Sequence, residues 1–290
     1  MARVREALTG GLHFNVGFQP ATCGSSLRRG VRRGLSADRG LARAKCVRVL
    51  EFDPELGLRV PADGITRARA ELVAPLQTFG RGVWEVPSDD GHVARLGYLV
   101  LEGLLGREVV LAGKTCTELL GESDMLLPPS AYLREEKLVR YHVQWHVLEP
   151  VRLAVLDDDF ARRLTQWPQV ISALFERGMR RSLRMSVHQA LLQLSPVETR
   201  LLVLFWFLAE RWGRVTPAGI VLGLRLSHQL LGQLVGCQRA SVTTALQRVA
   251  ASDLLERRPD GTWVLHGPPP DELAQLHWQP REVVAADAAS

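Results

Sequence analysis

The segment 228–247, HQLLGQLVGCQRASVTTALQ, constrains the fold more than any other part of the chain. Its apolar positions fit two short helices: Leu231, Val235, Val242 and Ala245. Gly232 is small where these helices would cross, and Gly236 sits at the turn between them. Two helices that meet at a steep angle need a small residue at the crossing and a turn residue that tolerates a positive φ. The segment therefore predicts a helix-turn-helix.

The second of these helices presents hydrogen-bonding side chains outward. They are Gln238, Arg239, Ser241, Thr243, Thr244, Gln247 and Arg248, and no acidic residue follows before Asp253. Side chains of this kind donate to phosphates and to base edges in a major groove. The alternative that fits the same pattern is a helical hairpin with a solvated polar face.

A hairpin is predicted directly after this helix. Leu254–Arg258 and Thr262–His266 can pair as strands around Pro259-Asp260-Gly261, and Asp-Gly is a strong hairpin turn signal. A hairpin in this place is a wing, from which Arg257 and Arg258 would reach the backbone of a duplex, although ordinary exposed hairpins also carry arginine.

A long helix is predicted upstream. Asp157-Asp158-Asp159 suits a helix N-terminus electrostatically, and Pro168 fits the first turn of a second helix that runs to about Leu194. Its spaced positions follow alternating steps of three and four: Ile171, Leu174, Gly178, Arg181, Met185, His188 and Leu192. Such a seam needs a partner helix, with Gly178 allowing close approach. We expect a dimer interface at Ile171, Leu174, Gly178 and Met185; the alternative is a helix packed only on its own chain.

Between the long helix and the helix-turn-helix, a further helix begins with Ser195-Pro196-Val197-Glu198. Ser at the N-cap, Pro at the first helical position and Glu three residues after Ser predict a capping box and a helix to about Trp212. Ile220–Leu226 then alternates as a short strand, and Ser227 is placed to cap the helix that follows it.

The region from Val47 to about Leu156 is dominated by strand signals. Short apolar runs at 96–105, 109–112, 138–148 and 151–156 are punctuated by Gly and Pro. In 141–147 apolar and polar residues alternate, which predicts a strand with one dry face. Strands at this spacing indicate a compact β-barrel or roll.

Composition and charge limit the possible functions. With 290 residues and 46% hydrophobic content the chain can hold two domains, and its longest apolar run, Leu201–Ala209, is far shorter than a membrane helix. Residues 1–48 hold ten basic and two acidic residues, which leaves 26 basic and 29 acidic residues in 49–290. Any nucleic-acid binding by the folded part must therefore be local. The tail is expected to be flexible; a basic arm that touches nucleic acid is an alternative.

Motifs for metal, thiol or enzyme chemistry are weak. His142 and His146 share one strand face and could hold a metal with His92, but four residues of strand separate them by about 13 Å. Cys237 fits burial as a small apolar residue better than a reactive thiol. No Gly-rich phosphate loop or nucleophile elbow occurs, and the four cysteines are isolated, which favours a reducing cytoplasm and a protein that is not an enzyme.

The succession of roll, long helix, capped helix and winged helix-turn-helix resembles the Crp/Fnr family of bacterial transcription regulators. The resemblance is strongest in LSHQLLGQLVGCQRASVTTALQRVAASDLL and the following DGTWVLHG, within residues 195–267. It implies an α+β fold with a cyclic-nucleotide-binding-like roll. It also implies a homodimer joined by the long helices, whose second helices enter successive major grooves of a roughly palindromic site.

The family's recognition helix typically begins Arg-Glu-Thr-Val, with a further Arg one turn on. Arg239 matches the first Arg, Ser241 the phosphate-contacting Thr, and Val242 the core position. Ala240 replaces the Glu that reads cytosine, and Thr244 stands where the second Arg would contact guanine. The operator of the cyclic-AMP regulator is therefore not expected for this chain.

The sensor motifs of the family match poorly. Gly121-Glu122 and Arg140-Tyr141-His142 stand in for the Gly-Glu and Arg-Ser/Thr-Ala that hold the ribose and cyclic phosphate. Cys23 and Cys46 cannot supply the four thiolates of an iron–sulfur centre. We expect no cyclic-nucleotide binding and no cofactor; an effector, if one exists, is unknown.

The predicted organisation is a flexible basic tail (1–46), a β-roll (47–156), a helical linker with the dimerisation helix (157–194), a winged helix-turn-helix (195–268) and a C-terminal tail (269–290). The expected DNA contacts are His228, Gln229, Gln238, Arg239, Ser241, Thr243, Thr244, Arg248, Arg257 and Arg258. The expected partners are double-stranded DNA and a second copy, with RNA polymerase as a further candidate and no membrane. Two alternatives stay open: a protein-interaction module whose winged helix no longer binds DNA, and a small-molecule enzyme built on the roll.

Overall fold

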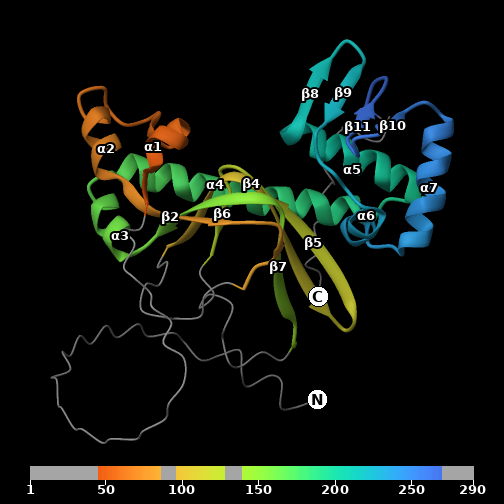
Figure 1. Ribbon diagram of the computed structural model, residues 1–290, viewed down its shortest axis with the longest axis horizontal. Coiled ribbons are helices and arrows are strands. Elements are labelled where there is room, and N and C mark those ends of the chain that lie inside the picture. Colours follow the sequence, from red (N-terminus) through yellow and green to blue (C-terminus); the bar gives the residue numbers. More distant parts are fainter. Residues whose placement is uncertain (1–44, 86–95, 128–138, 270–290) are drawn as a thin grey trace, which may run out of the picture. The chain divides into compact units, whose positions relative to one another are not determined.

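The computed structural model describes residues 45–85, 96–127 and 139–269, all of which lie within one compact unit, Arg43–Ser290. The fold is α+β, with a large antiparallel sheet in the first half of the chain and helices with a small sheet in the second (Figure 1). The predictions for residues 1–44, including Cys23, for His92 and for residues 270–290 lie outside the described residues. Within the described ranges, no helix has the length and apolar character needed to cross a bilayer.

The first half forms the roll. Its elements are β1 (Cys46–Arg48), α1 (Val49–Phe52), the 3-10 helix η2 (Pro54–Gly57), α2 (Ile65–Glu71), β2 (Val73–Phe79), β3 (Gly82–Val83), β4 (Gly97–Leu111), β5 (Lys114–Leu120), β6 (Met125–Leu126) and β7 (His142–Leu156). The sheet order is β1-β2-β7-β4-β5, with β3 paired to β7 and β6 paired to β4. Three short helices therefore occupy residues 49–71, in a region where strands were expected to predominate.

β4 and β7 differ from the prediction, because each is one continuous strand of 15 residues instead of two short ones. They pair along their length with register shifts between Val100 and Leu105. Gly103 has φ +91°, and a Cβ there would lie 2.1 Å from the carbonyl oxygen of Pro150. The glycine and the proline thus mark a bulge at which the paired strands bend and continue.

Aromatic rings fill the middle of the roll. The Trp84 ring centroid lies 5.5 Å from that of Tyr98 and 5.9 Å from that of Trp145. Trp145 and Val147 are buried, which confirms the dry face predicted for that part of 141–147, whereas Tyr141 is largely exposed. The centre of the roll is therefore a packed apolar core, which also contains Leu105, Leu120, Val151, Leu153 and Val155.

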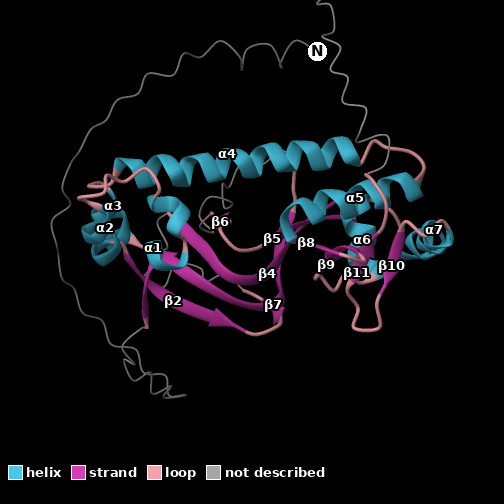
Figure 2. Ribbon diagram, turned by 90° about the horizontal axis from the view of Figure 1, so that it is seen from above, coloured by secondary structure: helices cyan, strands magenta, loops and turns pink. Residues whose placement is uncertain are grey.

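Two helices follow the roll: α3 (Asp158–Leu164) and α4 (Pro168–Leu191). Asp157 caps α3, because its side chain accepts a hydrogen bond from the backbone N–H of Phe160 at 2.8 Å, and Pro168 begins α4; both features confirm the prediction. Figure 2 shows α4 running alongside the sheet, with α2 and α3 near its first turn and α5 near its last.

The second half is a winged helix-turn-helix. Its elements are α5 (Val197–Trp212), β8 (Gly213–Thr216), β9 (Gly219–Leu222), α6 (His228–Val235), α7 (Arg239–Ala251), β10 (Leu255–Arg257) and β11 (Trp263–Leu265). The sheet order is β10-β11-β9-β8. Strand β8 was not predicted; it pairs with β9 in a hairpin that precedes α6.

The predicted capping box at the start of α5 is wrong. The N-cap is Pro196, which makes no side-chain cap hydrogen bond, and the helix begins at Val197 rather than at the proline. The Glu198 carboxylate instead accepts from Arg248 of α7 at 2.6 Å. Buried side chains of α5, including Leu201, Phe205 and Leu208, form the centre of the winged-helix core.

Candidate nucleic-acid interface

The first helix of the helix-turn-helix is fixed by its own sequence at both ends. Ser227 caps α6, because its hydroxyl accepts from the backbone N–H of Leu230 at 3.1 Å. At the other end Gly236 takes up the left-handed conformation with φ +67°, and the N–H of Cys237 donates to the carbonyl of Gly232 at 2.9 Å. The predicted cap and turn residue are both confirmed.

The helix crossing leaves no room for a side chain on Gly232. A Cβ added there would lie 2.7 Å from the carbonyl oxygen of Cys237, closer than real Cβ contacts allow. This confirms the prediction that a small residue is needed where α6 approaches α7. Cys237 is half-buried, and burial raises the pKa of its thiol, which agrees with a packing role.

The polar side of α7 lies on the surface. Val242, Ala245, Leu246 and Val249 are buried against the winged-helix core. The exposed residues at and along the helix are Gln238, Arg239, Ala240, Ser241, Thr244, Gln247 and Arg248. None of the described acidic residues pairs with Arg239. Most of the side chains predicted to face DNA are therefore accessible. Thr243 and Arg248 are described next, because other residues of the chain bind them.

Thr243 is held by a neighbouring helix rather than free to reach a base. Its hydroxyl lies 2.9 Å from His228 Nδ1 and is also hydrogen-bonded to the carbonyl of Arg239 at 3.1 Å. Both Thr243 and His228 are half-buried. Burial, followed by the positive charges of Arg257 and Arg239, lowers the pKa of His228. The histidine thus lies in a positive electrostatic potential, next to the surface where phosphates would bind.

Arg248 is exposed but paired. Its guanidinium lies 2.6 Å from the Glu198 carboxylate, which is the partner that the predicted capping box missed. A backbone hydrogen bond within Glu198 and the bond from Arg248 lower the pKa of this carboxylate. Arg248 can therefore reach a phosphate only by exchanging one acceptor for another.

Arg200 stabilises the C-terminal end of α6 through hydrogen bonds. No pattern in the sequence indicated this role. Its guanidinium donates to the carbonyl of Val235, in the last turn of α6, at 2.7 Å, and to the carbonyl of Leu194 at 2.9 and 3.1 Å. Charged donors at helix C-termini stabilise the carbonyls that the helix leaves unbonded. This contact fixes the end of α6 relative to the segment that follows α4.

The wing has the predicted pairing. Arg257 of β10 lies opposite Trp263 of β11, and Asp260 stabilises the turn by accepting from the N–H and hydroxyl of Thr262 at 2.9 and 2.7 Å. Arg257 is exposed and stacks over the Trp263 ring at 5.6 Å, whereas Arg258 is half-buried. Of the two predicted wing arginines, Arg257 is therefore the more accessible.

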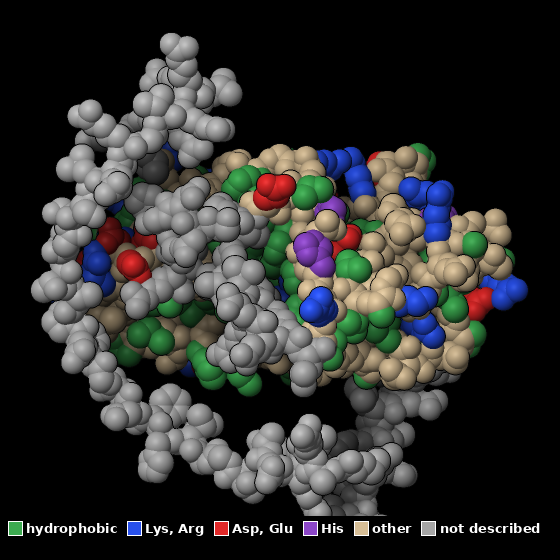
Figure 3. All heavy atoms as spheres, turned by 90° about the horizontal axis from the view of Figure 1, so that it is seen from below, with side chains coloured by type: hydrophobic (Ala, Val, Ile, Leu, Met, Phe, Trp, Pro, Cys, Tyr) green, Lys and Arg blue, Asp and Glu red, His purple; other side chains and the backbone are tan. Residues whose placement is uncertain are grey.

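Charge over this part of the molecule is mixed. Figure 3 shows separate basic side chains over the right-hand part of the face, where the winged-helix elements lie. The exposed arginines of residues 197–269 are Arg214, Arg225, Arg239, Arg248 and Arg257, and the exposed acidic residues are Glu210, Asp253, Glu256 and Asp260. α7 itself carries no acidic residue, so the charge on this helix is that of Arg239 and Arg248.

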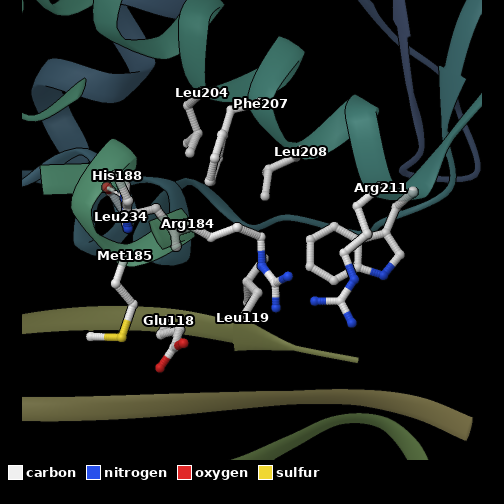
Figure 4. A pocket seen from close by; sticks show the side chains of 11 residues that line it. Glu118, Leu119, Arg184, Met185, His188, Leu204, Phe207, Leu208, Arg211 and Leu234 are labelled. Carbon is white, nitrogen blue, oxygen red and sulfur yellow. Dashed lines mark hydrogen bonds between the residues drawn. The ribbon is translucent and has the colours of Figure 1, made fainter. Parts of the chain in front are cut away.

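The roll and the winged helix contact each other at the side chains drawn in Figure 4, and this contact region is called the joint. His188 of α4 stacks on Phe207 of α5, and its Nε2 lies 2.7 Å from the carbonyl of Leu234. Arg184 and Arg211 point to one side of the same region, and each donates to the Asp124 carboxylate at 2.6 Å. Four elements, α4, α5, α6 and the turn after β5, therefore meet here.

The cavity within this joint has a volume of about 50 Å³. Organic ligands occupy pockets of about 300–1,000 Å³, so this space alone is too small for one. A neighbouring, more open pocket of about 550 Å³ shares Arg184, Phe207 and Arg211 with it and falls within that range. Gly121-Glu122, the candidate sensor pair, lies at the joint and not in the roll core: the Gly121 N–H donates to Asp124 at 2.9 Å, and the Glu122 carbonyl accepts from Arg211 at 2.5 Å. Arg140 is exposed.

The long helix has two unlike faces. Leu174, expected in the dimer seam, is 7% exposed and packs in the core of its own chain. The exposed apolar side chains of α4 are Ile171, Phe175, Met179, Leu183, Met185 and Val187, with exposed fractions from 36% to 69%. Gly178 is exposed with open space around it. Ile171, Gly178 and Met185 thus lie on the outward side, and Leu174 does not.

The described residues contain no group of three or more His, Cys, Asp or Glu placed to hold a metal ion. His146 lies 3.4 Å from Glu108, and His142 is exposed four residues away on the same strand. The third histidine of that hypothesis, His92, lies outside the described ranges.

No protein-family model and no curated protein matches the sequence. Solved structures do match. The CLP protein of Xanthomonas campestris, described as a c-di-GMP responsive global regulator, is similar with a TM-score of 0.53 and 22% identity over 72% of this chain and 100% of its own. FixK2 of Bradyrhizobium japonicum gives 0.51 and 15% over 67% and 93%, and a cyclic nucleotide-binding domain protein of Listeria monocytogenes gives 0.53 and 13% over 66% and 88%. These similarities show that the chain has a Crp/Fnr-like fold.

Proposed function

We propose that this protein is a homodimeric transcription regulator that binds specific sequences in double-stranded DNA through α7. The observation that carries the proposal is the exposed, acid-free face of α7, which begins with Arg239 and stands on a helix crossing that Gly232 and Gly236 make possible. An α-helix with its side chains is about 10–12 Å in diameter and fits a major groove about 12 Å wide.

The contacts divide by chemistry into base and backbone readers. Arg239 would bind guanine O6 and N7 through two of its guanidinium nitrogens, a contact worth roughly 1–3 kcal/mol of discrimination. Ser241, Gln238 and Gln229 are exposed and would bind phosphates, as would Arg257 from the wing. His228 would join them beside Arg257 and Arg239, although burial and these two charges lower its pKa in the free protein.

The outward apolar face of α4 supports a dimer. A single helix with large exposed side chains such as Phe175 and Leu183 leaves apolar surface in water, and a second α4 related by a two-fold axis would bury it. Gly178 and Ser182 on the same side would let the backbones approach. A two-fold dimer presents two copies of α7 to two half-sites, which is how a roughly palindromic site is read.

The packing of the roll argues against cyclic-nucleotide binding. Trp84, Tyr98 and Trp145 pack in its core, and Gly121-Glu122 serves the joint with the winged helix. We therefore propose that any effector is of another kind. A role for RNA polymerase as a partner stays a prediction.

The test is selection of bound fragments from random duplex DNA with the full chain. The wild type is expected to enrich one motif, and Arg239→Ala to lose the preference at one position in each half-site while sedimentation still shows a dimer. Arg162→Ala, which removes an exposed arginine of α3, is the matched control and should leave the motif unchanged. If the wild type enriches no sequence and binds no duplex at low salt, the proposal fails and a protein-interaction module is favoured.

A further inference from the structure

We propose that the middle of α7 reads the methyl groups of thymine, so that each half-site carries thymine next to the guanine that Arg239 binds. This inference rests on the proposed function and specifies the base sequence that the same helix would recognise. It follows from which side chains of α7 point away from the protein core, and from what their polar atoms are bonded to.

The geometry of the helix selects the central residues. At about 100° per residue, the side chains that lie opposite the buried Val242 and Val249 are those of Ala240, Thr244 and Gln247. All three are exposed. Arg239 lies to one side of this line, in the first turn. In a helix that enters a groove with its core side facing out, Ala240 and Thr244 are the residues brought nearest to the base edges.

Of the three, Gln247 is a polar reader, whereas Ala240 and Thr244 present methyl groups. Ala240 offers only a methyl group. The Thr244 hydroxyl donates to the carbonyl of Ala240 at 3.3 Å, so its proton is used within the helix and its methyl group is the part left to contact a base. In the major groove the C5-methyl of thymine is the apolar feature that distinguishes one base from the others, and small apolar side chains contact it.

Charged readers are absent from the same positions. A carboxylate at position 240 would accept a hydrogen bond from the amino group of cytosine, and an arginine at 244 would bind guanine. This chain has Ala240 and Thr244 there, and among the described residues Arg239 is the one arginine on α7 that is exposed without an ion pair. The half-site is therefore read as one guanine flanked by thymine methyl groups.

The experiment uses the duplex selected by the full-length dimer. Each thymine is replaced in turn by deoxyuridine, which removes only the methyl group, and dissociation constants are measured by fluorescence anisotropy. Burial of one methyl-sized group is worth about fourfold in affinity. We expect about that loss at one or two thymines next to the guanine, and none at thymines outside the footprint of α7.

Two variants of Thr244 separate the methyl group from the hydroxyl. Thr244→Val keeps the methyl and removes the hydroxyl; it should remain sensitive to uracil substitution. Thr244→Ser keeps the hydroxyl and removes the methyl; it should bind thymine and uracil duplexes equally at the position that residue 244 reads. Both changes are on the exposed face of α7, and circular dichroism verifies that each variant is folded.

The outcomes are distinguishable from failure of the proposed function. If a motif is enriched and Arg239→Ala alters it, but no thymine-to-uracil change affects affinity, thymine reading is overturned while DNA recognition stands. The same holds if Thr244→Ser retains full uracil sensitivity and Thr244→Val loses it, because the hydroxyl would then be the reader. If no duplex is bound at all, the proposed function fails first.

Discussion

Asp124 holds the joint between roll and winged helix together, and replacing it with asparagine tests how strongly. The carboxylate is 4% exposed, accepts from Arg184 and Arg211 at 2.6 Å each, and also accepts from the N–H of Gly121 at 2.9 Å. Asparagine keeps the shape but removes the charge and turns one acceptor into a donor, so one guanidinium loses its partner.

The magnitude follows from burial. Breaking a fully buried ion pair costs about 3–5 kcal/mol, because the remaining charge is desolvated without a partner. The side chains of Arg184 and Arg211 are 39% and 23% exposed, so water screens part of that loss. We expect Asp124→Asn to lower the free energy of unfolding by about 2–3 kcal/mol.

The matched control is Glu102→Gln on β4. Glu102 pairs with Arg152 of β7 at 2.8 Å, a similar distance, but the two side chains are 53% and 31% exposed. An exposed pair contributes about 0–1 kcal/mol. Unfolding in urea, followed by tryptophan fluorescence, compares the two variants with the wild type. If their unfolding free energies agree within about 0.5 kcal/mol, burial of Asp124 does not set the strength of the joint, and the argument is wrong.

Changes at the helix crossing, at the histidine and on the outward face of α4 have equally specific outcomes. Gly232→Ala puts a methyl group 2.7 Å from the Cys237 carbonyl, so we expect a loss of roughly 1–3 kcal/mol in thermal or urea unfolding; an unchanged midpoint would contradict this. Burial and the nearby Arg257 and Arg239 lower the pKa of His228 in the free protein, and DNA phosphates would raise it, so binding takes up a proton and affinity should rise as the pH falls through the pKa of the bound histidine. His228→Gln should abolish this rise in anisotropy titrations, and a wild type with no pH dependence would refute the assignment. Leu183→Glu and Gly178→Trp should each convert dimers to monomers in sedimentation; persistent dimers would exclude this face of α4.

The helix-turn-helix was predictable because its determinants are local. Ser227 and Gly236 act on residues within five positions of themselves, and each does what its type and position predicted. Ser195 failed as an N-cap by comparison. Glu198, which should have completed that cap, bonds to Arg248, fifty residues further along, and no local pattern reports such a partner.

The roll shows the same limit for strands. A glycine within an apolar run can end a strand or form a bulge, and the choice depends on the partner strand. Gly103 packs against the carbonyl of Pro150, so two residues that read as breaks on their own form one bulge together. The sequence between 96 and 156 therefore indicated strands correctly but divided them at the wrong points.

The candidate site divides in a similar way. The exposure of Arg239 and Ser241 follows from helical periodicity and was predicted. The bond between Thr243 and His228 joins two helices and was not. On α4, the predicted positions, which are spaced by three and four residues, lie along both edges of one apolar face of the helix. The roll takes one edge, with Leu174, and leaves the other outward. The periodicity of apolar residues predicted the helix, but it could not show which edge packs against the chain's own roll.

The position of the joint restricts how a signal from the roll could reach DNA. Among the described residues, the contacts of the roll with α5 and α6 include the ion pair of Asp124 with Arg211, a hydrogen bond between Thr117 and Gln233 at 3.2 Å, and apolar packing of Leu104 and Leu119 in the winged-helix core. Thr117 is 1% exposed, and its partner Gln233 is half-buried. An event in the roll alters α7 only if it changes one of these contacts or moves α4. Asp124 also binds Arg184 of α4, so the DNA affinity of Asp124→Asn tests the part of the coupling that passes through this carboxylate.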